Sequence, residues 1–195
     1  MKTPEKLFGE MLGLDEAWVV ERATFNASSQ AVEPHVRETE KLWQKERCPH
    51  DGSDGVVCHD HVRGVRWRHL NVFSKETEIV CDLPRGQCRK CARVWRVVAP
   101  REGRGKHFTK EFEAFALTLM PEMPLKSASK ILGEQDTRMW RVLHAYVKEA
   151  RAAVDMSEVC NVGVDEMARA KGRRYLTVFA DLADRRVLFA TPGKD

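Results

Sequence analysis

Two pairs of metal-binding residue types carry the clearest chemistry in this sequence. CRKC, Cys88 to Cys91, has the spacing that lets two thiolates reach one tetrahedral zinc ion at roughly 2.3 Å. CPHDG, which starts at Cys48, opens in the same way but has Asp51 where a second cysteine would stand. Because a carboxylate can also bind zinc, these four residues predict a structural Zn²⁺ site with three sulfur ligands and one oxygen ligand.

Two alternatives to this ligand set stay open in the sequence. A neighbouring side chain could replace Asp51 as the fourth ligand, and the candidates are His50, Cys58, His59 and His61. The segment could also be a metal-free hairpin with stray cysteines. An oxygen ligand would make the site more sensitive to acid than sulfur ligands alone.

The residues between the two pairs predict a β-hairpin, which completes the layout of a zinc ribbon. VRWRHLNVF and TEIVCDLPR are β-leaning runs separated by SKE. Cys81 shares a strand face with Ile79 and Leu83, so we expect it to be buried rather than bound to metal. We expect Cys160, alone at the edge of a later strand, to serve packing as well.

The first 47 residues predict a mixed cap that says little about function. Their AWVVERATF run alternates as a strand does. Pro34 restricts the run that follows to an edge strand or a loop, because proline lacks the N–H that an inner strand donates.

From Thr109 the hydrophobic period changes from 2 to 3.6, which predicts three helices ending near residue 154. Thr109 is the N-cap candidate of the first helix, and Gly133 closes the second. A glycine turn before a basic last helix is typical of a helix-turn-helix, although a generic three-helix bundle has the same pattern. The expected inward stripe of the last helix is Trp140, Leu143, Val147 and Ala150.

Positive charge is concentrated in residues 61–110, which hold 13 Lys and Arg against four Asp and Glu in a chain of net charge +4. Aromatic residues are interleaved with these charges. This combination suits a surface for a polyanion, and a solvated basic face is the alternative interpretation.

Three further β runs follow Cys160, and the first of them contains adjacent acids, Asp165 and Glu166. Phosphoryl transfer with two metal ions requires several converging carboxylates. Adjacent strand residues point to opposite faces, so these two cannot both serve one ion if both lie in regular strand. An ordinary acidic strand end is the alternative.

The order of these parts resembles bacterial insertion-sequence transposases of the ISL type, over roughly residues 42–195. The resemblance rests on CPHDG, WRHL, LPRGQCRKC, HFTKEFE and, most specifically, VGVDEMARAKGRRYLTVFADLADRRVLFATPGKD. It implies an α+β multi-module chain that ends in the first three antiparallel strands of an RNase H-like DDE catalytic domain. The expected segments are a cap at 1–47, a zinc ribbon at 48–98, a helix-turn-helix at 107–154 and the catalytic segment at 160–195.

The resemblance also implies residue roles. Cys48, Cys88 and Cys91 bind zinc, with Asp51 at the position of the family's second cysteine. Asp165 is the first acid of the DDE triad and would bind Mg²⁺ in a complete catalytic domain. The expected DNA-binding residues, by helix position, are Arg138, Arg141, Lys148 and Arg151.

Two departures from the family pattern affect the expected activity. Asp51 and Ala92 stand where the family has cysteine and glycine, which bears on zinc affinity. The family's two later catalytic acids lie beyond the third strand, so we expect an incomplete chain that is inactive alone. The predicted function is a DDE transposase, and the alternative is a non-catalytic DNA-binding remnant or repressor.

Composition sets the remaining limits. With 43% hydrophobic residues, no apolar run near the roughly 18 that span a bilayer and no export signal, we expect a cytoplasmic protein without a membrane role. The expected partner is double-stranded DNA at transposon ends, and a homo-oligomer is compatible with the sequence. The target DNA sequence, the oligomeric state and whether the chain is a fragment or a truncated gene cannot be read from these residues.

Overall fold

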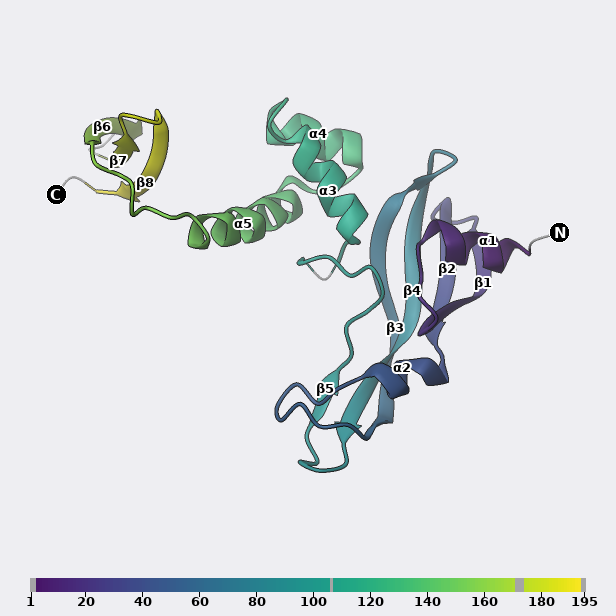
Figure 1. Cartoon of the computed structure of the whole chain (residues 1–195). Helices are drawn as coiled ribbons and strands as arrows, with labels where there is room; N and C mark the ends of the chain where they lie inside the picture. The colour runs from purple at the N-terminus through teal and green to yellow at the C-terminus, as the bar shows by residue number, and fades with distance from the viewer. Residues whose placement is uncertain (1–2, 106, 171–173, 194–195) are drawn as a thin grey trace. The chain divides into compact units, whose positions relative to one another are not determined.

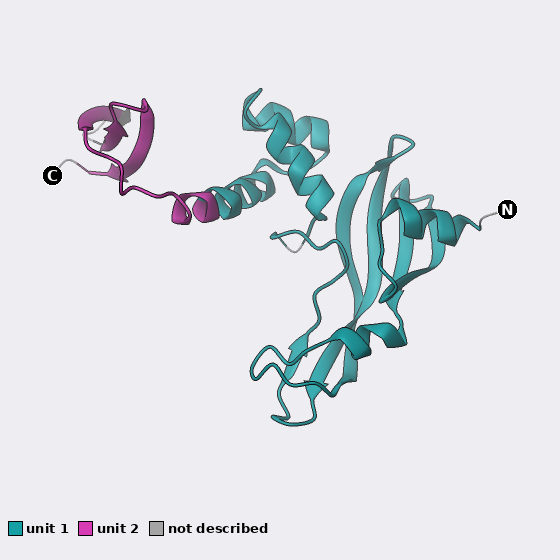
Figure 2. Cartoon of the chain, in the orientation of Figure 1, with its two compact units in different colours: residues 1–147 teal, residues 148–195 magenta. Residues whose placement is uncertain are grey.

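The computed structural model describes residues 3–105, 107–170 and 174–193 (Figure 1). The chain divides into two compact units, residues 1–147 and residues 148–195 (Figure 2). The first unit contains the segments expected as cap, ribbon and most of the helix-turn-helix. The second contains the end of the last helix and the strands expected after Cys160.

A five-stranded sheet dominates the first unit, with strands in the order β1-β2-β4-β3 and β5 paired to β4. Its strands are β1 (Trp18–Asn26), β2 (Ala31–Glu38), β3 (Val56–Val72), β4 (Lys75–Cys88) and β5 (Val94–Arg96). Two short helices, α1 (Pro4–Met11) and α2 (Glu40–Lys45), accompany it. The first 47 residues therefore contribute two strands to the sheet that carries the ribbon.

The predicted hairpin between the metal-binding pairs is confirmed as β3 and β4. Its loop is tighter than the sequence indicated, because Val72 already pairs with Lys75. Phe73 and Ser74 form the connection with positive φ angles of 49° and 61°. Two consecutive left-handed residues match the right-handed twist of the flanking strands, as a two-residue hairpin turn requires.

Pro34 lies in an inner strand, so the expectation of an edge strand or loop was wrong. β2 pairs with β1 on one side and with β4 on the other. The parallel pairs between β2 and β4 stop at Val32 and resume at His35. The ladder is thus interrupted at Pro34, where an inner strand can accommodate a residue without an N–H.

The core under the sheet confirms the predicted strand face of β4. Ile79, Cys81 and Leu83 are 0%, 2% and 0% exposed. Burial raises the pKa of the Cys81 thiol to about 12, so Cys81 is a packing residue.

Three helices follow the sheet: α3 (Lys110–Leu119), α4 (Leu125–Leu132) and α5 (Asp136–Ala152). The predicted N-cap is confirmed, because the Thr109 hydroxyl accepts from the Phe112 N–H at 3.3 Å. Gly133 ends α4 with a left-handed φ of 71°.

The inward stripe of α5 lies one residue away from the predicted one. Met139 and Val142 are 0% and 1% exposed, whereas Trp140 and Val147 are 50% and 44% exposed. The apolar spacing placed Trp140 on the inward stripe, but Met139 is the residue that packs beside Phe108 and Phe112.

Backbone pairing joins the three helices to the sheet. The Arg68 N–H donates to the His107 carbonyl at 2.8 Å, and the Thr109 N–H donates to the Arg68 carbonyl at 2.9 Å. Above this bridge Phe108 and Phe112 stack at 4.8 Å between ring centroids. The guanidinium of Arg68 covers Phe112 at 5.4 Å, so cation–π contact adds to the apolar packing.

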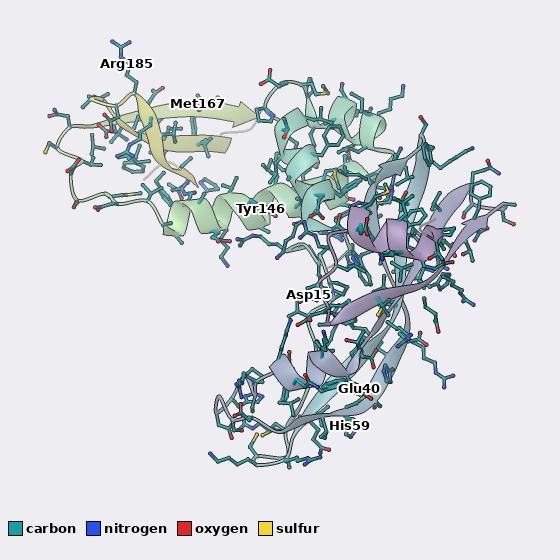
Figure 3. All side chains as sticks on the ribbon, turned by 45° about the vertical axis from the view of Figure 1, so that its right-hand side comes forward. Asp15, Glu40, His59, Tyr146, Met167 and Arg185 are labelled. Atoms are coloured by element: carbon teal, nitrogen blue, oxygen red, sulfur yellow. The ribbon has the colours of Figure 1, made fainter. Side chains whose placement is uncertain are left out.

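A buried carboxylate anchors the segment that leads into α3. Glu113 is 0% exposed and accepts from the N–H groups of Arg104 and Gly105, at 2.9 and 2.7 Å, and from the Tyr146 hydroxyl at 2.9 Å. A Cβ at Gly103 would lie 2.4 Å from this carboxyl group, so only glycine fits there. Tyr146, labelled in Figure 3, thereby links α5 to this anchor.

The second unit contains the predicted three-stranded antiparallel sheet, in the order β6-β7-β8. Its strands are β6 (Val162–Ala170), β7 (Arg174–Asp181) and β8 (Arg186–Pro192). Cys160 is exposed, so the expectation that it serves packing was wrong.

Glu113→Ala should lower the free energy of unfolding by about 3 kcal/mol, because two partly buried N–H groups and one hydroxyl lose their acceptor. Chemical denaturation of the variant against wild type measures the loss. Glu122→Ala, on an exposed glutamate nearby, is the matched control and should change stability by less than about 0.5 kcal/mol. Equal effects of the two substitutions would contradict the anchoring role of Glu113.

Candidate metal centre and helix-turn-helix surface

Two turns of nearly identical backbone geometry form the candidate metal centre at one end of the β3 and β4 pair. In the first turn the Gly52 N–H donates to the Cys48 carbonyl at 2.8 Å, and the Cys48 N–H donates to Ser53 at 3.0 Å. The second turn repeats both bonds around Cys88, with Ala92 at 3.0 Å and Arg93 at 3.1 Å.

The equivalence of the two turns explains the position of Asp51. Asp51 stands three residues after Cys48, as Cys91 stands three residues after Cys88. The next residue in each turn is left-handed, with φ of 69° at Gly52 and 56° at Ala92. Alanine pays a steric cost there that glycine does not. Asp51 therefore occupies the place of a second cysteine in a turn that is otherwise intact.

The four predicted ligands converge. One donor atom from each of Cys48, Asp51, Cys88 and Cys91 lies within 4.8 Å of the others. The sulfurs of Cys48 and Cys91 are 3.6 Å apart, close to the roughly 3.8 Å edge of a tetrahedron built on 2.3 Å zinc–sulfur bonds. Cys48 and Cys88 are buried, at 2% and 1% exposure. The donor types and spacing therefore fit zinc.

Ser53 holds the carboxylate of Asp51, the one oxygen donor of this cluster, through two hydrogen bonds. Its hydroxyl donates to a carboxylate oxygen of Asp51 at 2.6 Å, and its N–H donates to the same oxygen at 3.0 Å. These bonds hold the pKa of Asp51 at about 2, well below its usual value. Asp51 is therefore a carboxylate at any physiological pH.

The two buried cysteines differ in acidity. Burial raises the pKa of Cys48 to about 11, whereas the hydrogen bond with Ser53, together with backbone N–H groups, lowers the pKa of Cys88 to about 7. Zinc must therefore displace a proton from Cys48 at neutral pH, which makes binding weaker as the pH falls.

The alternative ligands considered for the ribbon lie outside this cluster. His50 is 3.0 Å from a guanidinium nitrogen of Arg93 and stands edge-on to Trp95. Cys58 and His61 belong to a separate group with Glu38, and His59 pairs with Asp60 at 3.2 Å. The structure thus brings together Asp51 and the three cysteines.

Much of the positive charge in residues 61–110 is used inside the fold. Arg66 pairs with Glu33 and Glu78, both at 2.9 Å. Further pairs join Arg85 to Asp60, Arg96 to Glu102 and Arg101 to Glu111. The basic residues of the second cysteine turn, by contrast, are exposed: Arg89, Lys90 and Arg93.

The predicted DNA-binding residues in the first unit, Arg138 and Arg141, differ in their availability. Arg138 donates to Glu134 at 2.5 Å, and its guanidinium lies 4.6 Å from the centroid of Phe108. Arg138 therefore extends the packing of the aromatic pair. Arg141 is exposed on α5, beside exposed Trp140 and His144.

The other two predicted DNA-binding residues belong to the second unit. Lys148 is exposed. The Arg151 guanidinium donates to the Leu188 carbonyl and lies 5.7 Å from the centroid of the Phe189 ring.

Asp165 is the fourth residue of β6, opposite Val178, and Glu166 is opposite Thr177. The two acids lie in regular strand and so point to opposite faces, which is the condition under which they cannot both serve one ion. Among the described residues, the groups of three or more converging metal-ligand side chains do not include Asp165.

Comparison with known families matches both candidate regions. Residues 44–91 match the zinc finger of the transposases of IS204, IS1001, IS1096 and IS1165, and residues 103–147 match the helix-turn-helix domain of transposase family ISL3. The chain carries the zinc ribbon and helix-turn-helix of ISL3 transposases. The predicted resemblance is thus confirmed for these two segments.

Curated relatives extend the similarity beyond the two ISL3 segments. The chain is 26% identical over 200 residues to transposases for insertion sequence element IS1557 from two strains of Mycobacterium tuberculosis, CDC 1551 and H37Rv. The match covers 97% of this chain but 43% of each relative, so the chain spans less than half their length. No solved structure matches.

The helices that the structure describes include none long and apolar enough to span a membrane.

Asp51→Ala should weaken zinc binding at least about tenfold, because a charged ligand is lost from a four-ligand site. Asp51→Cys should bind zinc more tightly than the wild type at neutral pH. Below neutral pH its affinity should fall more steeply than that of the wild type, by about a further factor of ten per pH unit. The reason is that the new thiol must lose a proton to bind zinc, whereas Asp51 is already ionised. Competition with a chromophoric chelator measures both effects.

Asp54→Ala, on an exposed aspartate of the same loop, is the control for this pair of variants. If Asp51→Ala bound zinc as tightly as Asp54→Ala, Asp51 would not be a ligand.

Proposed function

We propose that this chain is the DNA-recognition part of a DDE-type insertion-sequence transposase and binds double-stranded DNA at transposon ends. The observation that carries the proposal is the joining of a four-ligand ribbon and a helix-turn-helix within one compact unit. The two family matches cover the same regions. The names of the curated relatives agree with this function.

DNA contact through α5 is supported by the exposure of its polar side. The second element of a helix-turn-helix places its first turns in the major groove. Arg141 and His144 are exposed there, and Trp140 provides a half-exposed aromatic surface. Arg141 is therefore our principal candidate for contact with DNA, Lys148 is a second, and Arg138 and Arg151 would first have to leave their present partners.

Zinc has a structural role in this proposal. Cys48, Asp51, Cys88 and Cys91 would hold the ion and so fix both turns, the second of which carries exposed Arg89 and Lys90. These side chains would add phosphate contacts that are independent of base sequence.

Asp165 is proposed as the first catalytic acid of an RNase H-like domain that begins with β6, β7 and β8. One carboxylate does not make a Mg²⁺ site, so no catalytic step is derived from the described residues. The support is its place within the first strand and the antiparallel order of the sheet.

Arg141→Ala should weaken binding to a duplex taken from the DNA that flanks the gene by about tenfold. If Arg141 contacts a phosphate, the slope of log affinity against log salt should become shallower by about 0.9. Fluorescence anisotropy over a series of salt concentrations measures both quantities. Arg37→Ala, on an exposed arginine of β2, is the matched control. Wild-type binding without any salt dependence would overturn the DNA proposal.

Asp165→Asn should abolish strand cleavage by a full-length transposase that contains this segment, without changing its affinity for DNA. Glu166→Gln is the matched neighbour, because it points to the opposite sheet face, and should retain cleavage. A gel assay of cleaved transposon ends distinguishes them. Cleavage that survives Asp165→Asn would contradict the catalytic assignment.

A further inference from the structure

A second group of metal-binding side chains lies on the sheet, outside the ribbon cluster. Glu38 comes from the end of β2, and Cys58 and His61 come from β3. One donor atom from each lies within 4.8 Å of the others. β2 and β3 flank β4 in the sheet, so this group connects two strands that do not pair with each other.

A β-bulge creates this arrangement from a spacing that would otherwise prevent it. Residues three apart in a regular strand point to opposite faces. The register of β3 shifts between Cys58 and Asp60, because Cys58 pairs with Gly86 and Asp60 pairs with Arg85. His59 is the extra residue, and Cys58 and His61 are thereby brought to the same face.

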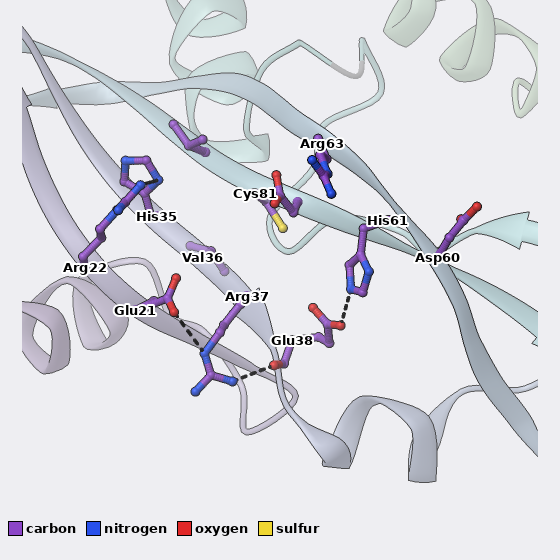
Figure 4. Close-up of a pocket in the computed structure, with 12 residues that line it drawn as sticks. Glu21, Arg22, His35, Val36, Arg37, Glu38, Asp60, His61, Arg63 and Cys81 are labelled. Carbon is purple, nitrogen blue, oxygen red and sulfur yellow. Dashed lines mark hydrogen bonds and ion pairs between the residues drawn. The ribbon is translucent and has the colours of Figure 1, made fainter.

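The neighbouring groups leave these three donors free to converge. Cys58 is opposite Gly86, against which the side chains of Val56 and Trp95 pack, and Cys58 itself is exposed. Asp60 is held by Arg85, whose Nε donates to its carboxylate at 2.5 Å. Figure 4 shows His61 and Glu38 facing each other beside a pocket of about 790 Å³.

The distances approach those of a tetrahedral zinc site. The Cys58 sulfur is 4.0 Å from Nε2 of His61, where a shared zinc ion would place them roughly 3.5 Å apart. Nε2 of His61 is 2.6 Å from Oε1 of Glu38, a hydrogen bond that the ion would replace at roughly 3.3 Å. These two separations each need to change by less than 1 Å, and His61 and Cys58 are both exposed.

We propose that Glu38, Cys58 and His61 form a second zinc site, with the fourth position open to water from the adjoining pocket. One thiolate, one neutral imidazole and one carboxylate balance the charge of Zn²⁺, and three protein ligands plus water are typical of open zinc sites. The ion would tie the end of β2 to the bulged part of β3. With a single sulfur ligand, this site binds zinc at least about tenfold more weakly than the ribbon.

Zinc titration of the full chain against a chromophoric chelator tests the proposal. Wild type should bind two zinc ions, and Cys58→Ser and His61→Ala should each bind one. The matched controls are His59→Ala and Cys160→Ser, which lie outside the group and should retain two. Far-UV circular dichroism confirms that the variants are folded.

Cobalt substitution separates the second site from the ribbon. In Cys88→Ser, which damages the ribbon, Co²⁺ at the second site should still give a sulfur-to-cobalt charge-transfer band of single-thiolate intensity. Adding His61→Ala should abolish that band. The proposal would be overturned if the wild type bound a single zinc ion and Cys58→Ser still bound it. It would also be overturned if the wild type bound two ions and both Cys58→Ser and His61→Ala still bound two. One ion that is lost in Cys58→Ser but kept in Cys88→Ser would support it and contradict the ribbon site instead.

Discussion

The pairing of β3 with β4 is the constraint on which both the candidate metal centre and the attachment of the helices depend. β4 ends at Cys88, which pairs with Val56 at the start of β3, so the strand pair places the second cysteine turn beside the first. Toward the other end, Arg68 on β3 forms the backbone bridge to residues 107–109, which begin the helical part. A slip of one residue in this pairing would turn every side chain to the opposite face and separate the ligands. The ribbon and the helix-turn-helix are therefore parts of one packed unit.

Buried polar groups reinforce that unit where apolar packing alone would leave polar atoms without partners. The carboxylate of Glu113 satisfies two N–H groups before α3, and the hydroxyl of Thr109 satisfies one at its start. His69 also contacts the Thr109 hydroxyl, at 2.9 Å, and burial lowers the pKa of His69 to about 4. His69 is therefore neutral at physiological pH, and the contact region carries no charge at this residue.

The parts of the fold that local chemistry determines could be predicted from the sequence. Alternation on β4 located the buried face of Cys81, and the helix boundaries followed from Thr109 and Gly133. Long-range pairing could not be predicted: Pro34 lies in an inner strand only because the ladder with β4 is interrupted there. Trp140 was placed inside on hydrophobicity, but the packing around Phe108 selects Met139.

The same distinction applies to the candidate sites. The ribbon ligands were predictable because two short motifs each hold their ligands within one turn. The group of Glu38, Cys58 and His61 was not, since a bulge at His59 and a strand 20 residues earlier are needed to assemble it. The sequence signal for it was limited to Cys58, His59 and His61, which we considered only as alternative ligands of the ribbon. The ion pairs of residues 61–110 could not be predicted from the sequence either, because partners such as Glu33 and Glu111 lie outside that segment.

We propose that Asp51 completes the zinc ribbon, in a turn whose backbone has the same hydrogen bonds as the turn that carries Cys91. X-ray absorption at the zinc edge, on the wild-type chain loaded with one equivalent of zinc, tests it most directly. The account predicts three sulfur atoms at about 2.3 Å and one oxygen atom at about 2.0 to 2.2 Å. A first shell with one sulfur, or with nitrogen and oxygen alone, would contradict it.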